Sequence, residues 1–332
     1  MKLGQVARET HPGRKRRHNE DAYVLQPPLF AIADGMGGAQ AGEVASALAA
    51  GALNESEIDS GGEERVIELI QEANRRVHER ASTDAATSGM GTTMTVALVE
   101  LDGKVTFGHV GDSRAYLLRD DRLEQLTNDH SLVAELVRRG ELSPQEAEVH
   151  PQRSVITRAL GTDPDVDVDA FTIEARPGDV YLICSDGLSD MVGASQIEEV
   201  LRRSRDDLGR AAKALVEAAN RSGGEDNITA VLFEIVADDG APAVSEPDAP
   251  TVEAARVAFD EEDTLHPEDG VQPPPAATAV DTMVVPTEEI RAAVEAAEEE
   301  VHVSFARRVL VVLVILALMA LIVVLVVWGL AR

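Results

Sequence analysis

The sequence predicts an α+β fold of mainly antiparallel strands, followed by a linker and one C-terminal transmembrane helix. Short β-rich stretches follow one another directly, as in TTMTVALVEL, KVTFGHV and RAYLLR, and Asp-Gly or Asp-Asp pairs between strands are typical of hairpin turns. Stretches with helical periodicity interrupt the strands, and the end of the chain is one uninterrupted apolar run. A doubly wound parallel sheet would instead require a helix between most strands.

Five helical stretches are expected within the N-terminal part of the chain. The first two form a pair that could cover one face of a sheet. The predicted helices span residues 39–53, 63–82, 129–139, 195–203 and 206–221.

The folded domain is predicted to span residues 1–237 of the 332 residues. Beyond the strand-like ITAVLFEIV, residues 238–308 become rich in Pro, Ala and acidic residues, with 18 acidic residues against two arginines between 238 and 300, a balance of −16. Such a segment cannot bury enough apolar surface to offset its chain entropy, so it is interpreted as a linker. Thr287, followed by two glutamates, indicates a capped helix next to the membrane.

Residues 309–330, VLVVLVILALMALIVVLVVWGL, carry no charge and predict a single membrane span. About 22 residues at ~1.5 Å each would cross a hydrocarbon layer of roughly 30 Å. The N-terminus has no apolar targeting segment, and Arg307 and Arg308 precede the span. We therefore expect a single-pass protein of the cell membrane with its N-terminal domain in the cytoplasm.

The net charge of −29 argues against a nucleic-acid partner, because a phosphate-binding surface needs clustered Lys and Arg. The one basic cluster, RKRR at residues 14–17, is short. The single cysteine, Cys184, lies in an apolar stretch, which indicates a core residue in a reducing compartment.

Acidic residues stand at the margins of four apolar strands. Asp34 follows LFAIA, Asp112 follows KVTFGHVG, Asp186 follows VYLICS, and Asp226 precedes NITAVLFEI. Each alone is explained by an ordinary turn. Together, converging carboxylates would repel one another, and a protein that gathers them usually holds divalent cations. With oxygen ligands and no His or Cys cluster at zinc spacing, the sequence favours Mg²⁺ or Mn²⁺.

The motifs resemble those of the metal-dependent PPM-type (type 2C) protein phosphatases over residues 3–236. The order and spacing of the motifs together are specific, and the resemblance is closest to bacterial members, some of which are membrane-anchored. The matching motifs are RRHNEDAY (16–23), ADGMGGAQAGEVAS (33–46), GMGTT (89–93), GDSRAYLLR (111–119), DHSLVAELVRRGELSPQEAEVHPQRSVITRALG (129–161), CSDGLSD (184–190) and EDNITAV (225–231). The resemblance implies two packed, mainly antiparallel sheets flanked by helices, an α/β/β/α sandwich.

The resemblance also implies a ligand set for two ions in the catalytic centre and for a third, weaker one. Asp34 would bridge two ions, with Asp186 and Asp226 completing the first site. Glu20 and the carbonyl of Gly35 would serve the second. Asp112, with Asp186 and with Asp190 as a candidate, would hold the third.

The same resemblance gives Arg16 the role of phosphate binding and Asp21 that of positioning a water. A planar guanidinium suits bidentate contact with phosphate oxygens. In eukaryotic relatives a histidine two residues after the bridging aspartate is the proposed general acid, but here that position is Met36. His109, His130 and His150 are the remaining candidates for this role.

The implied function is hydrolysis of phosphoserine and phosphothreonine in proteins by direct attack of a hydroxide that bridges two metal ions. The partners would be phosphoproteins, among them Ser/Thr kinases and their substrates, and the segment from about 138 to 165, which resembles the family's variable flap, would influence which of them binds. Two alternatives are a membrane-tethered pseudophosphatase that only binds, and a small-molecule phosphohydrolase. The full set of carboxylates argues against the first, and the lack of a nucleotide-cradling P-loop argues against a nucleotide substrate.

Overall fold

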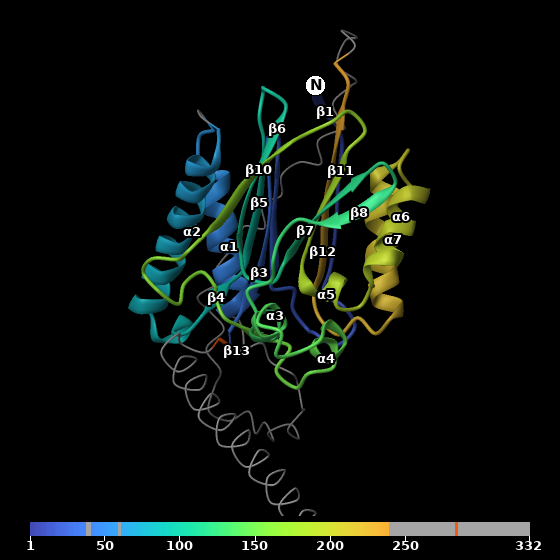
Figure 1. Cartoon of the computed structure of the whole chain (residues 1–332). Helices are drawn as coiled ribbons and strands as arrows, with labels where there is room; N and C mark the ends of the chain where they lie inside the picture. The colour runs from blue at the N-terminus through green and yellow to red at the C-terminus, as the bar shows by residue number, and fades with distance from the viewer. Residues whose placement is uncertain (38–40, 59–60, 239–282, 285–332) are drawn as a thin grey trace, which may run out of the picture.

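Two antiparallel sheets pack face to face in the structure, a computed structural model that describes residues 1–37, 41–58, 61–238 and 283–284. Helices α1 and α2 cover the outer face of one sheet, and α6 and α7 cover the outer face of the other (Figure 1). The predicted α/β/β/α sandwich is confirmed. These helices are α1 (Ala41–Asn54), α2 (Glu63–Thr83), α6 (Ala194–Arg203) and α7 (Leu208–Arg221).

The first sheet, called the β1 sheet below, joins the two ends of the domain. Its strand order is β1-β12-β11-β7-β8, and the N-terminal strand pairs with the last strand of the domain. The strands are β1 (Lys2–His11), β12 (Ile228–Val236), β11 (Val180–Cys184), β7 (Arg114–Arg119) and β8 (Arg122–Gln125). Because β11 and β12 lie side by side in the centre, the residues at their ends are brought together from distant parts of the chain.

The second sheet, called the β3 sheet, has the order β10-β6-β5-β3-β2, and the short strand β4 pairs with the end of β3. Its strands are β10 (Asp169–Glu174), β6 (Lys104–Val110), β5 (Met94–Val99), β3 (Leu29–Met36), β2 (Asp21–Gln26) and β4 (Gly91–Thr92). Strand β3 is buried along most of its length between β2 and β5.

Side chains alternate along β3 as the period of a strand requires. Ala31 and Ala33 face α1 and α2, whereas Phe30 and Ile32 point into the layer between the two sheets. There the ring of Phe30 stacks on that of Phe233 from β12, with centroids 4.5 Å apart. This aromatic layer sets the distance between the sheets, and therefore between the acidic residues at their strand ends.

The predicted helices are present, with shifted ends. The stretch predicted at 129–139 forms α3 (Leu132–Arg138) only, because the Ser131 side chain accepts a hydrogen bond from the Ala134 N–H and so caps the helix. Three shorter elements were not predicted: α4 (Pro144–Glu148), α5 (Asp186–Ser189) and a 3₁₀ turn, η1 (Ala85–Thr87). Cys184 is buried among the apolar residues between the β1 sheet and its helices, as predicted.

The flap, residues 138–165, lies across one end of the sandwich and contains α4 and strand β9 (Val155–Ile156) (Figure 1). Strand β13 (Met283–Val284) pairs with β9 in parallel. Ile156 packs against Met36 and Ala159, so the flap contacts the end of β3.

The domain boundary near residue 237 remains a prediction, although β12 ends at Val236. Apart from residues 283–284, the predicted linker at 238–308 is described only at Asp238, and the predicted span at 309–330 lies outside the described residues. In the part of the chain that the structure does describe, no helix has the length and apolarity that a membrane crossing requires.

Candidate metal centre

The predicted acidic residues meet where the two sheets end on the same side. Asp34, near the end of β3, is the register partner of Asp21 at the start of β2. Across the sandwich, Asp186 begins α5 directly after β11, and Asp226 stands two residues before β12. Acidic residues that border both sheets therefore lie at the same end of the sandwich.

Burial and mutual repulsion dominate the electrostatics of this group. Burial, and then the negative charges of the neighbouring aspartates, raise the pKa of Asp34 well above its ordinary value. The pKa of Asp186 is raised in the same way, first by burial and then by Asp112, Asp190 and Asp226. A carboxylate that is removed from water and surrounded by like charges needs a cation or a proton as compensation.

Asp21 is held in place by two hydroxyl groups that the sequence analysis did not single out. Its Oδ2 accepts hydrogen bonds from the Ser185 hydroxyl at 2.9 Å and from the Thr229 hydroxyl at 2.6 Å. Its Oδ1 is buried and has no hydrogen-bond partner among the described residues. Burial raises the pKa of Asp21 to about 6, while the two hydroxyl groups act in the opposite direction. The carboxylate is thus fixed by one oxygen and presents the other to the site.

The donor set fits divalent cations. Two buried carboxylate oxygens, Asp21 Oδ1 and Asp186 Oδ1, lack hydrogen-bond donors among the described residues, and buried polar atoms are rarely left so. Only oxygen ligands are offered, which suits Mg²⁺ or Mn²⁺. As arranged in this structure, however, no three His, Cys, Asp or Glu side chains of the described residues are close enough to enclose an ion. The carboxylates lie close enough to raise one another's pKa values, but they would have to move closer together to bind an ion.

Arg16, Glu20 and Gly35 lie at the same end of the sandwich. Arg16 Nη2 donates to Asp226 Oδ2 at 2.8 Å, which places the predicted phosphate-binding arginine beside a predicted metal ligand. The Gly35 N–H donates to the Glu20 carbonyl at 3.1 Å. A Cβ on Gly35 would overlap the Gly42 carbonyl oxygen in the first turn of α1, so only glycine permits this close approach.

Asp112 lies in the turn between β6 and β7, within electrostatic reach of Asp186. Burial, followed by the charges of Asp129 and Asp190, raises the pKa of Asp112 to about 7. The pKa of Asp190 is also raised, chiefly by burial. The structure therefore brings all three predicted ligands of the weaker site together electrostatically.

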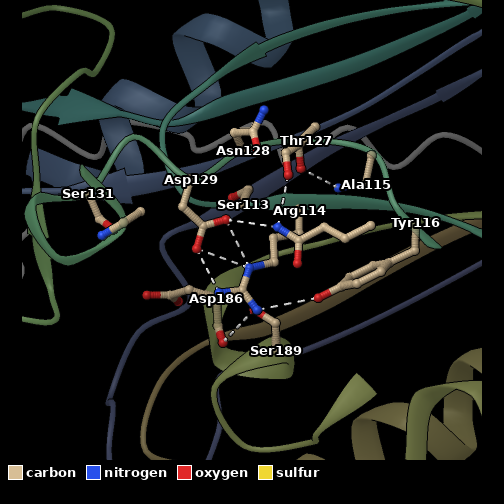
Figure 2. Close-up of polar contacts among 12 residues, drawn as sticks. Ser113, Arg114, Ala115, Tyr116, Thr127, Asn128, Asp129, Ser131, Asp186 and Ser189 are labelled. Atoms are coloured by element: carbon tan, nitrogen blue, oxygen red, sulfur yellow. Dashed lines mark hydrogen bonds and ion pairs between the residues drawn. The ribbon is translucent and has the colours of Figure 1, made fainter. Parts of the chain in front are cut away.

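A partly buried ion pair holds the strand that follows Asp112. Arg114 donates through Nε and Nη2 to both carboxylate oxygens of Asp129, with the shortest contact at 2.6 Å (Figure 2). Arg114 Nη1 also lies 3.4 Å from the Tyr116 hydroxyl. The bidentate geometry fixes the loop around residue 129 against the start of β7. The positive charge of Arg114 also lowers the pKa of Asp112, which partly offsets the effect of burial.

Two of the three candidate histidines are unsuited to proton transfer in this site. His109 and His130 are buried, their rings pack 4.7 Å apart, and both ring nitrogens of each lie within hydrogen-bonding distance of protein atoms. Burial lowers the pKa of His109 to about 3 and also lowers the pKa of His130. His150 is partly exposed in the flap, where its Nδ1 accepts from the Gln152 N–H.

The sequence did carry a signal for the residues that were missed. Ser185 directly precedes Asp186, and Thr229 stands three residues after Asp226, so each hydroxyl neighbours a strand-end acid. Which carboxylate such a hydroxyl would contact depends on how the two sheets pack, and that is not readable from local pattern. Asn227 was also missed. Its amide Oδ1 accepts a hydrogen bond from the backbone N–H of Glu20, a predicted metal ligand, at 2.7 Å.

Comparison with known proteins points to one family. The family model described as protein phosphatase 2C matches residues 13–232. The serine/threonine phosphatase Stp of Listeria innocua is 40% identical over 237 residues, covering 68% of this chain and 93% of that protein. The serine/threonine protein phosphatase PstP of Mycobacterium tuberculosis is 41% identical over 235 residues, covering 70% of this chain and 45% of that protein.

Solved structures agree with the sequence comparisons. The crystal structure of the Mycobacterium tuberculosis phosphatase PstP/Ppp superposes with a TM-score of 0.67 at 39% identity, covering 71% of this chain and 100% of that one. The catalytic domain of PstP in complex with two manganese ions gives a TM-score of 0.65 at 37% identity, covering 71% of this chain and 99% of that one.

Proposed function

The chain belongs to the protein phosphatase 2C family and is a metal-dependent serine/threonine protein phosphatase, and from this premise we propose which side chains carry out the reaction and where in the cell it takes place. The observation that carries the proposal is the group of buried, mutually repelling carboxylates at the strand ends, with two oxygens that lack donors among the described residues.

Two Mn²⁺ or Mg²⁺ ions would be held at the end of the sandwich. Asp34 would bridge them, Asp186 and Asp226 would complete one site, and Glu20 with the Gly35 carbonyl would complete the other. A third, weaker ion would bind at Asp112, with Asp186 shared and Asp190 as a further candidate ligand. The oxygen-only donor set, the buried orphan oxygens and the manganese in the related PstP structure support this assignment.

The protein's own groups bind and orient the phosphoryl group and water. The Arg16 guanidinium would engage two phosphoryl oxygens in a bidentate contact, giving up its bond to Asp226 as that carboxylate turns to a cation. Asp21, fixed through Oδ2 by Ser185 and Thr229, would accept a proton from water at its unpartnered Oδ1. When bound, the ions would supply the Lewis acidity that lowers the pKa of water and neutralises charge on the phosphoryl oxygens.

The leaving group would take its proton from solvent. Met36 stands where eukaryotic relatives have a histidine, and His109 and His130 are buried with lowered pKa values. His150, in the flap, is the one candidate among these residues with solvent access.

The central experiment is Mn²⁺-dependent release of phosphate from a phosphothreonine peptide, with the Asp186→Ala variant compared with the wild-type protein. We expect a loss of at least about a hundredfold, because removing one ligand disrupts the charge compensation on which metal-assisted hydrolysis depends. Asp206→Ala is the matched control, since Asp206 is exposed and pairs with Arg210, four residues further along the chain. Equal rates in wild type and Asp186→Ala would contradict the assignment.

The phosphatase domain would act at the cytoplasmic face of the cell membrane, anchored by residues 309–330 through the acidic linker at 238–308. The apolar run, the preceding arginines and the absence of charge within it support this location. The part of this linker from 238 to 300, about 63 residues, would reach several tens of ångströms, at roughly 5–6 Å times the square root of its length. The phosphoproteins within reach would include substrates of membrane-bound Ser/Thr kinases, and such kinases themselves.

Deleting residues 301–332 tests the location. The truncated protein should move to the soluble fraction after membrane sedimentation while keeping full activity on a small phosphopeptide. Continued sedimentation with membranes would contradict the proposed anchor without affecting the assignment of the catalytic residues.

A further inference from the structure

His130 connects three segments that lie far apart in the sequence. Its ring Nδ1 accepts a hydrogen bond from the Gly111 N–H at 3.0 Å, and its backbone N–H donates to the Gly111 carbonyl at 2.8 Å. The carbonyl of His130 accepts from the N–H of Thr157, in the flap, at 2.8 Å. With only 4% of its surface exposed, His130 is therefore fixed to the Gly111 turn on one side and to the flap on the other.

The proton position in this ring follows from its partners. Because Nδ1 accepts from a backbone N–H, a neutral ring must carry its proton on Nε2, which donates to Asp169 Oδ2 at 3.1 Å. Burial and the charge of Arg158 lower the pKa of His130, which favours the neutral form. Arg158 Nη1 also lies 3.1 Å from Nε2, but both atoms carry protons, so this is a close contact and not a second hydrogen bond.

The flap completes the network through Arg158. Arg158 Nη1 donates to Asp169 Oδ1 at 2.7 Å, so the two oxygens of Asp169 are bonded to the histidine and to the flap arginine. Asp169 is the first residue of β10 and thus belongs to the rigid β3 sheet. The contacts join the flap, the sheet and the Gly111 turn in one set of side chains.

The Gly111 turn has little freedom of its own. Gly111 has φ of 111°, and a Cβ there would lie 2.6 Å from the Cβ of Thr93. The next residue, Asp112, is 9% exposed, and its negative charge raises the pKa values of both Asp34 and Asp186. A shift of the Gly111 backbone would therefore displace the Asp112 carboxylate directly.

We propose that His130 is a positioning residue that couples the flap to Asp112, so that displacement of the flap weakens cation binding at Asp112 and a bound cation in turn steadies the flap. The inference rests on the proposed function to the extent that Asp112 binds a cation. Thermodynamic linkage requires the two effects to be equal in magnitude. The flap would be the element that changes position, and its contact with the site is the hydrogen-bonded path from Arg158 through Asp169 and His130 to Gly111.

The test uses the domain of residues 1–238, because a solved relative that consists of this region alone is covered over its whole length. Mn²⁺ binding is measured by titration calorimetry, and flap opening by the rate of trypsin cleavage after Arg139 and Arg153 with and without Mn²⁺. Neither readout depends on turnover. The variants are Asp169→Ala, its isostere Asp169→Asn, and His130→Ala.

The matched control is Asp167→Ala. Asp167 also faces Arg158, with its Oδ2 3.6 Å from Nη2, but it does not touch His130 and is 88% exposed. In the wild type, Mn²⁺ should slow trypsin cleavage of the flap. Asp169→Ala and His130→Ala should weaken the lowest-affinity Mn²⁺ site about five- to tenfold and abolish this protection. Asp169→Asn should fall between the wild type and Asp169→Ala in both effects, since its one amide oxygen can accept from the histidine or from Arg158 but not from both. Asp167→Ala should match the wild type.

The outcomes separate the coupling from the metal assignment. If Asp112→Ala leaves every Mn²⁺ site intact, the proposed ligand role of Asp112 is wrong. If Asp112→Ala removes the weak site but Asp169→Ala keeps both its affinity and its Mn²⁺-dependent protection, only the coupling is wrong. Should His130→Ala fail to fold, the Asp169 variants decide the matter, because Asp169 lies at the surface and its side chain is 44% exposed.

Discussion

Replacing Asp112 with asparagine should stabilise the metal-free protein at alkaline pH. The folded state raises the pKa of Asp112 from 3.8 to about 7, chiefly by burial, so the folded protein binds this proton more tightly than the unfolded chain does. The associated stability is complete below pH 3.8 and is lost as the pH rises through about 7. At pH 8 the buried carboxylate therefore opposes folding, whereas an amide of the same shape carries no charge.

The size of this effect follows from the shift. A pKa change from 3.8 to about 7 corresponds to at most about 4 kcal/mol, at ~1.4 kcal/mol per pKa unit. Half of that, about 2 kcal/mol, should raise the melting temperature by roughly 4–8 °C for a domain of this size. At pH 5, which lies between 3.8 and about 7, the difference should be less than half as large, and it should vanish below pH 3.8.

The assay is thermal unfolding of residues 1–238 in chelator at pH 5 and pH 8, followed by circular dichroism, and then repeated with Mn²⁺. Added Mn²⁺ should stabilise the wild type more than Asp112→Asn, because the variant offers a poorer ligand. Asp129→Asn is the control: Asp129 pairs with the partly buried Arg114, so loss of its charge should lower stability by about 1–3 kcal/mol at pH 8. A metal-free Asp112→Asn protein that melts at or below the wild-type temperature at pH 8 would refute the reasoning.

Three further substitutions follow from the geometry. Arg16→Lys should lower kcat/KM on a small phosphate ester by about ten- to a hundredfold with little change in melting temperature, since lysine lacks the planar fork; steady-state kinetics at saturating Mn²⁺ checks this. Gly35→Ala should weaken Mn²⁺ binding measured by calorimetry, because the new Cβ would overlap the Gly42 carbonyl oxygen, and unchanged binding would count against it. Phe30→Ala should cost about 3–5 kcal/mol in urea unfolding through loss of the stack on Phe233, whereas a cost below 1 kcal/mol would show that the aromatic layer is not essential.

Much of the fold was predictable because it depends on local patterns. Successive β-rich stretches joined by hairpin turns indicated antiparallel sheets. Four of the five predicted helices begin and end within two residues of their predicted positions among the described residues. The exception, α3, begins three residues later than predicted. The side chains of Asp129 and His130 accept hydrogen bonds from Arg114 and from the Gly111 N–H, and Ser131 then caps the helix. The short helix α4 carried a readable capping signal, because the Ser143 and Glu146 side chains each bond to the other's backbone N–H.

The candidate site was predictable only in its charged members. The strand-end aspartates stand out as a set, because four of them border apolar strands, although each alone is explained by an ordinary turn. The hydroxyls that fix Asp21 do not stand out, since Ser185 and Thr229 reach it only through the packing of the β1 sheet on the β3 sheet. The histidines could not be ranked from sequence for the same reason, because their burial depends on contacts made by residues far along the chain.

The carboxylates of the metal centre come from both sheets, which has a consequence for the effect of mutations in the interior. Asp21 and Asp34 belong to one sheet, and Asp186 and Asp226 border the other. A cation bound among them would therefore cross-link the two sheets. A substitution in the aromatic filling that lets the layers slide by a fraction of an ångström would change every oxygen separation at once. Mutations in the interior, far from the metal centre, would then change the affinity for the metal before they measurably reduce the fraction of folded protein.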